Sequence, residues 1–185
     1  GCGWRGGLEI SHDRVIAGLQ ILRPLVEPNA GIGVGQDIEV DVPELADHLL
    51  VFIDLNVGWT LDSKQRHWLE DLLVDGDNYS RIIVFSHQLV WTDYVGTDVL
   101  PNSYSGLSGG VPDFAELLDL FDAVSSPVMF VAGDIGSGNN PGLYCGAKDG
   151  VHYLANGLGG ESDSLIELTL LEHGGITVHP IELGS

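Results

Sequence analysis

Three short apolar runs constrain the fold more than any other feature of this sequence. They cover residues 48–55 (HLLVFIDL), 81–86 (RIIVFS) and 127–132 (PVMFVA). Continuous apolar runs of this length are typical of strands that are buried on both faces, as in parallel sheets. Amphipathic segments separate the runs. The order strand, helix, strand, helix, strand therefore predicts an α/β fold around a mainly parallel sheet with flanking helices.

The segments between the runs have the apolar spacing of helices. The first follows residue 60, and Thr60 or Asp62 could cap its helix. The second covers residues 113–124 (DFAELLDLFDAV). A further helix is expected over residues 12–23, where Pro24 would end it.

The rest of the chain predicts strands and loops. Residues 37–42 (DIEVDV) alternate as in a half-exposed strand, and residues 92–112 and about 134–150 are expected to be loops. Three further strands are expected over residues 151–155, 164–171 and 175–182. The last two can pair as a hairpin, which suggests a second, antiparallel sheet packed beside the first. With no repeat and no linker, residues 1–185 are expected to form a single domain.

The charge of the chain is strongly acidic, with 27 Asp plus Glu against seven Lys plus Arg and a formal net charge of -20. Such a surface repels nucleic acid and anionic membranes at long range, so neither is expected as a partner. It would suit cation binding or a saline habitat, although an acidic solvated surface without a ligand is the simpler interpretation. No run of about 18 apolar residues exists, so no membrane span is expected.

The start of the sequence and its two cysteines each allow more than one interpretation. The chain begins with Gly and has no basic segment followed by an apolar one, so no signal peptide is visible. We expect a processed or excised piece of a longer protein, and a secreted or periplasmic origin stays open. Cys2 and Cys145 could form a disulfide or remain two thiols.

Polar residues follow each of the three apolar runs. Asp54 and Asn56 follow the first run, His87 and Gln88 the second, and Asp134 the third. The carboxyl ends of parallel strands share one edge, where α/β proteins bind ligands. An Asp, His and Asp set can bind Zn, Mn or Fe. The alternative is that strand ends are polar because they reach solvent.

Several segments resemble the C-terminal half of the calcineurin-like metallophosphoesterases. Residues 52–89 read as a strand ending in Asp, a helix with Gln65-Arg66-His67-Trp68-Leu69, and a strand ending in a metal-ligating His. PVMFVAGDIG (127–136) is similar to the strand and turn that present Gly-His-x-His in that family, and VHYLANGLGG (151–160) to the strand and turn that follow. The resemblance covers about residues 48–183 and implies half of the family's sandwich fold.

The resemblance implies a hydrolase with a divalent metal, Mn, Zn or Fe, and a small phosphoester substrate. By position, His87 would be a metal ligand, Asp134 a surrogate ligand, and Asp54, Asn56 and Gln88 outer-shell residues. The sequence departs from the family in two ways. Gly133-Asp134-Ile135-Gly136 lacks both histidines of Gly-His-x-His, and the N-terminal ligand motifs are absent. We therefore expect an incomplete metal site and little activity from this chain alone.

Two other functions are compatible with the sequence. A non-catalytic binding module on a degenerate metallophosphoesterase fold would explain the lost histidines, and a half-domain could self-associate through its exposed face. A serine hydrolase is the lesser alternative. Gly106-Leu107-Ser108-Gly109-Gly110 matches G-x-S-x-G, and Ser108, Asp134 and His152 stand in the chain order of a triad, but no strand precedes Ser108.

Overall fold

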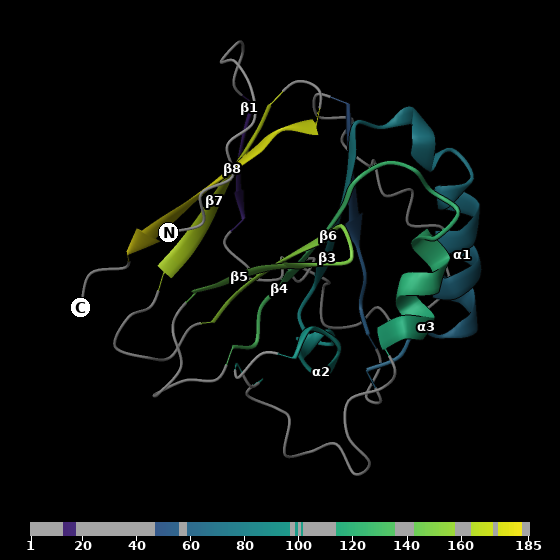
Figure 1. The fold of residues 1–185 in the computed structure, drawn as a ribbon, viewed down its shortest axis with the longest axis horizontal. Helices are drawn as coiled ribbons and strands as arrows, with labels where there is room; N and C mark the ends of the chain where they lie inside the picture. The colour runs from purple at the N-terminus through teal and green to yellow at the C-terminus, as the bar shows by residue number, and fades with distance from the viewer. Residues whose placement is uncertain are drawn as a thin grey trace, which may run out of the picture.

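A mixed five-stranded sheet forms the centre of the protein (Figure 1). The computed structural model describes residues 13–17, 47–55, 59–96, 99, 101, 114–135, 143–157, 164–171 and 174–182. The strands of this sheet, in spatial order, are β2 (His48–Phe52), β3 (Arg81–Ser86), β4 (Val128–Ala132), β6 (Val151–Asn156) and β5 (Leu143–Lys148). The first four are parallel and β5 is antiparallel, which confirms the predicted α/β fold.

A second sheet has three antiparallel strands. It consists of β1 (Asp13–Ala17), β7 (Ser164–Leu170) and β8 (Ile176–Glu182), in the order β1-β7-β8. The pairing of β7 with β8 confirms the predicted terminal hairpin. Side chains of β7, namely Ile166, Leu168 and Leu170, pack in one cluster with residues of β2, β3, β4 and β6. The small sheet therefore covers one face of the large one.

Helices cover the opposite face of the large sheet (Figure 1). They are α1 (Ser63–Leu73), the single-turn α2 (Thr92–Val95) and α3 (Phe114–Leu118), which continues as a 3₁₀ turn over Asp119–Phe121. The Asp62 side chain accepts a hydrogen bond from the Gln65 backbone N–H at 2.8 Å, so the predicted cap of α1 is confirmed. None of the helices described here is both long enough and apolar enough to span a membrane.

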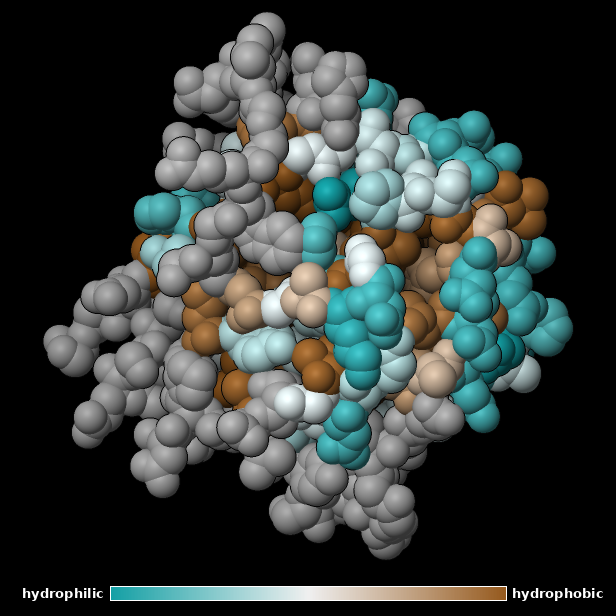
Figure 2. All heavy atoms as spheres, in the orientation of Figure 1, coloured by the Kyte–Doolittle hydropathy of each residue, from teal (hydrophilic) through white to brown (hydrophobic). Residues whose placement is uncertain are grey.

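The outer side of the helical layer is mostly polar. In Figure 2 hydrophilic residues gather over the side that carries α1, with a few hydrophobic residues among them. Trp68 of α1 is 39% exposed, and Val74, which follows the helix, is 80% exposed. Leu69 and Leu73 point the other way, into the core. The helix is thus amphipathic, as its spacing predicted.

Two predicted elements are wrong. Residues 13–17 form strand β1 and not part of a helix, because they pair with the free edge of β7, and a short apolar pattern does not resist such pairing. Residues 143–148 form strand β5 and not a loop. The missed signal was Asp149-Gly150, whose φ angles of 51° and 82° suit a two-residue hairpin turn between β5 and β6.

Other boundaries differ in detail. The loop expected over residues 92–112 contains α2 at its start, and the helix expected over 113–124 splits into α3 and the 3₁₀ turn. The strand predicted over residues 37–42 lies outside the described residues. Cys145 of β5 is disulfide-bonded. The other cysteine of the chain, Cys2, lies outside the described residues.

Gly174 joins the two sheets at the start of β8. Its φ of +77° is in the left-handed region that favours glycine. A Cβ atom here would lie 2.3 Å from the backbone carbonyl oxygen of Ser80. The Gly174 carbonyl also accepts a hydrogen bond from Arg81 Nε at 2.6 Å. The turn before β8 can therefore lie this close to the start of β3 only because residue 174 has no side chain.

Replacing Gly174 by alanine should destabilise the protein more than the same change at Gly96. Gly96 has a similar φ of +73° but nothing within 4 Å of an added Cβ, so Gly96→Ala measures the backbone cost alone, about 1 kcal/mol. Gly174→Ala adds the clash with Ser80 and should cost about 1–3 kcal/mol more. Urea denaturation of both variants checks this, and equal losses would contradict the close fit.

Candidate functional site

The carboxyl ends of the parallel strands lie in register along one edge of the large sheet. Phe52 is opposite Phe85, Ser86 is opposite Ala132, and Ala132 is opposite Ala155. The ladder continues past the strand ends, because the Ile53 N–H donates to the Phe85 carbonyl at 2.9 Å and the Gly133 N–H donates to the Ser86 carbonyl at 3.3 Å. Asp54, His87 and Asp134 each follow within two residues of a strand end. They therefore occupy the same edge.

These three side chains differ in exposure. Asp54 and His87 are exposed, whereas Asp134 is buried, with 7% of its surface accessible. An exposed imidazole is accessible to a ligand from solvent. A buried carboxylate is costly unless it is paired or hydrogen-bonded, and Asp134 is not without an interaction partner.

The chain turns sharply after His87. The Ser86 hydroxyl donates to the Gln88 carbonyl at 3.0 Å, which fixes the turn, and Leu89, Val90 and Trp91 then enter the core. Gln88 Nε2 donates to the Leu55 carbonyl at 3.4 Å, and this bond connects the end of β3 to the segment after β2. His87 thus lies at the tip of a turn that is held from both sides.

Gln88 has an unusual buried atom. Its Oε1 is buried and has no hydrogen-bond partner among the residues that the structure describes. A buried amide oxygen without a partner costs roughly 1–3 kcal/mol, although Gln65 Oε1 in α1 and the Trp91 and Tyr153 polar atoms in the core are in the same situation among the described residues. Asn56, predicted as another outer-shell residue, lies outside the described residues.

Strained backbone is found near the same edge. Asp134 has a φ of 59°, and Trp59, which lies between β2 and α1 and is 7% exposed, has a φ of 58°. Positive φ is a conformational outlier for a residue as bulky as Trp. Such a conformation costs about 1–3 kcal/mol at each position, and it also occurs away from this edge, at Asp47 before β2 and at Asp149 in the turn between β5 and β6.

Asn156 is a further polar residue at this edge, which the sequence analysis did not single out. It ends β6 at the same edge, and it is 4% exposed. The next residue, Gly157, faces the loop after β4 so closely that a Cβ would lie 2.3 Å from the Ile135 carbonyl oxygen. The available signal was a polar residue ending an apolar strand, the same signal that marked Asp54 and His87.

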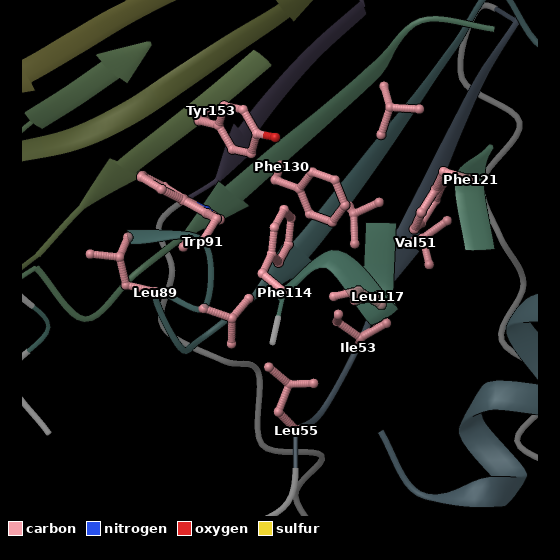
Figure 3. Packing of buried hydrophobic residues seen from close by; sticks show 14 of the residues in the cluster. Val51, Ile53, Leu55, Leu89, Trp91, Phe114, Leu117, Phe121, Phe130 and Tyr153 are labelled. Atoms are coloured by element: carbon pink, nitrogen blue, oxygen red, sulfur yellow. The ribbon is translucent and has the colours of Figure 1, made fainter. Parts of the chain in front are cut away.

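An aromatic core supports the edge from the helical side (Figure 3). The Trp91 ring lies 5.2 Å from the ring of Tyr144 and 5.3 Å from that of Tyr153, measured between centroids. Phe114 of α3 and Phe130 of β4 extend the cluster with a centroid distance of 5.0 Å. Burial raises the pKa of Tyr153 well above its usual value, so this hydroxyl stays protonated. Trp91 is therefore a core anchor of the His87 turn and not a surface for a substrate.

The described residues do not by themselves fit a complete metal centre. Within the described ranges, no three His, Cys, Asp or Glu side chains lie close enough together to hold a metal ion. His87 and Asp134 share an edge, but a divalent metal in proteins usually needs three or more protein ligands. Any complete centre would require donors from outside the described part of the chain.

The proposed serine-hydrolase triad fits the structure poorly. Ser108 lies outside the described residues. His152 pairs with Met129 near the start of β4, whereas Asp134 follows the end of that strand. The strand rises by about 10 Å from Met129 to its end at Ala132, and Asp134 follows that end, which is too far for a hydrogen bond between the carboxylate and the imidazole.

The strain at Asp134 can be measured with two substitutions. Asp134→Ala and Asp134→Gly both remove the carboxylate, but only glycine adopts a φ of 59° without cost. Asp134→Gly should therefore be more stable than Asp134→Ala by about 1 kcal/mol in urea denaturation. Equal stability of the two variants would show that the backbone at this position is unstrained.

Comparison with known proteins identifies no relative. No protein-family model, no curated protein and no solved structure matches the chain. The case for a function therefore depends on the residues at the carboxyl edge of the sheet.

Proposed function

We propose that this chain forms part of a metal-dependent phosphoric ester hydrolase of the calcineurin-like kind, with little activity when isolated. The observation that carries the proposal is the exposed His87 imidazole, held on a turn at the carboxyl edge of the parallel strands. The three-layer arrangement supports it, because a half of that sandwich fold has helices on one face of a sheet and a second sheet on the other.

His87 is the principal ligand in this proposal. A neutral ring nitrogen of an exposed histidine binds Zn, Mn or Fe readily. Asp134, one strand away, serves as a hard oxygen ligand or as an acceptor for a group that holds the metal. Asp54 is the third candidate, and Gln88, with its buried Oε1, is an outer-shell residue.

The acidic surface gives an independent reason to expect a metal. A chain with a net charge of -20 repels a phosphate ester at long range. A divalent cation at the edge would reverse the sign of the local field and attract the ester. Without it, we expect the ester to bind weakly at this edge, where no Lys or Arg directly follows the strand ends among the described residues.

Metal titration tests the role of His87. We expect weak Mn²⁺ or Zn²⁺ binding to the chain by calorimetry, and His87→Ala should weaken it about tenfold or more. His67→Ala is the matched control, because His67 is also exposed but lies on α1, with its Nδ1 near the Ser63 carbonyl. Equal loss in both variants, or none in either, would contradict the proposal.

Activity measurements test the expected incompleteness. The isolated chain should hydrolyse a generic aryl phosphate no faster than the metal ion alone. If the chain is assayed within a longer natural protein, His87→Ala should abolish turnover, and His67→Ala should not. Robust metal-dependent hydrolysis by the isolated chain would show that its site is complete.

The second candidate function is a non-catalytic binding module. Two observations favour it: Gly133-Asp134-Ile135-Gly136 contains no histidine, and the described residues hold no three-ligand group. Phe52, 58% exposed at the end of β2 and stacked on Phe85 at 4.7 Å, offers a surface for self-association. Absence of stoichiometric metal together with a Phe52-dependent dimer in light scattering would favour this module over the hydrolase.

A further inference from the structure

Arg81 lies at the opposite, amino-terminal edge of the large sheet. It begins β3, is half-buried, and extends on the face covered by the small sheet, the same face as Ile83. Its Nε donates to the Gly174 carbonyl at 2.6 Å, and its Nη1 donates to His152 Nδ1 at 3.2 Å. Both acceptors are uncharged, and these bonds use two of the five guanidinium N–H groups.

Within the described part of the chain, no carboxylate balances the positive charge of Arg81. Burial lowers the pKa of Arg81, and no acidic group of the described residues offsets it. The chain has 27 acidic residues, so carboxylates are abundant elsewhere. A partly desolvated cation that lacks an anionic partner is unfavourable, and proteins normally pair such groups.

His152 beside Arg81 is in its neutral form. A guanidinium only donates, so Nδ1 of His152 must accept with a lone pair. Burial, and then the charge of Arg81, lower the pKa of His152 below its usual value. An anion placed against both groups would reverse this effect, because it would attract a proton to the imidazole.

We propose that Arg81 and His152 form a binding site for a small oxyanion, such as phosphate or a carboxylate group. The planar guanidinium matches the oxygen pairs of both classes. His152 supplies a second positive charge when it is protonated, so binding takes up a proton. The two residues come from β3 and β6, and Arg81 also holds the turn before β8, so the anion would strengthen the contact between the two sheets.

The site is independent of the proposed hydrolase edge. His152 pairs with Met129 near the start of β4, whereas Asp134 follows the end of that strand, about 10 Å further along the strand direction. Long-range repulsion from the acidic surface weakens anion binding, but it is screened beyond about 8 Å at physiological ionic strength. A site built from direct hydrogen bonds remains effective under those conditions.

Imidazole NMR provides the primary test. Inorganic phosphate, titrated against chloride at constant ionic strength, should shift the His152 ring resonances in a saturable manner. Those of His67 and His179, which are exposed, should move little. Acetate in place of phosphate distinguishes a carboxylate site from a phosphate site, and a response to either ion supports the proposal. Equal or unsaturable shifts at all three histidines would overturn it.

Three variants sharpen the test. Arg81→Lys keeps the positive charge but loses the planar guanidinium with its paired N–H donors. It should weaken the apparent phosphate affinity about tenfold. Arg66→Gln on α1 is the matched control and should leave the affinity unchanged. His152→Asn keeps an acceptor near the Nδ1 position but cannot be protonated, so it should remove the tighter binding expected at about pH 6 relative to about pH 8. Unchanged affinity in Arg81→Lys, or an unaltered pH dependence in His152→Asn, would overturn the proposal.

Discussion

Burial of the large sheet on both faces is the constraint on which the rest of the structure depends. Alternate residues of β3 pack in different directions: Ile82 and Val84 face the helices, while Ile83 and Phe85 face the small sheet. Each fully buried side chain of this size contributes roughly 1.5–3 kcal/mol. Because both faces of the sheet are packed, polar groups gather at the two ends of its strands, which form the carboxyl edge and the amino edge.

The two edges have opposite characters. The carboxyl edge presents Asp54, His87 and Asp134, with strained backbone and a buried amide oxygen nearby. The amino edge presents Arg81 and His152, bonded to each other and to the turn before β8. The two proposed sites, one for a metal ion and one for an oxyanion, therefore lie at opposite edges of the same sheet.

The sequence was most informative where burial determined the outcome. The apolar runs predicted β2, β3 and β4, and those polar residues after them that the structure describes, Asp54, His87, Gln88 and Asp134, follow strand ends at one edge, as expected for parallel strands. Prediction failed where pairing between distant residues decided the structure. Residues 13–17 became a strand because β7 had a free edge, and the Arg81 contact with Gly174 spans 93 residues, beyond the reach of any local pattern. The metal-ligating role of His87 stays a prediction, because exposure and position are necessary for a ligand but do not identify one.

The pairing of β1 with β7 also bears on how the chain folds. Asp13 pairs with Leu170, so the small sheet closes a loop of more than 150 residues, whereas β2, α1 and β3 are neighbours in sequence. Closing so long a loop costs conformational entropy before any contact repays it. During synthesis the large sheet can assemble strand by strand as each helix follows, but the face that carries Ile83, Met129 and Leu154 remains uncovered until β7 emerges. Until β7 is synthesised and pairs with β1 and β8, this apolar face has no cover from the small sheet, so the contacts that protect it are among those of longest range along the chain.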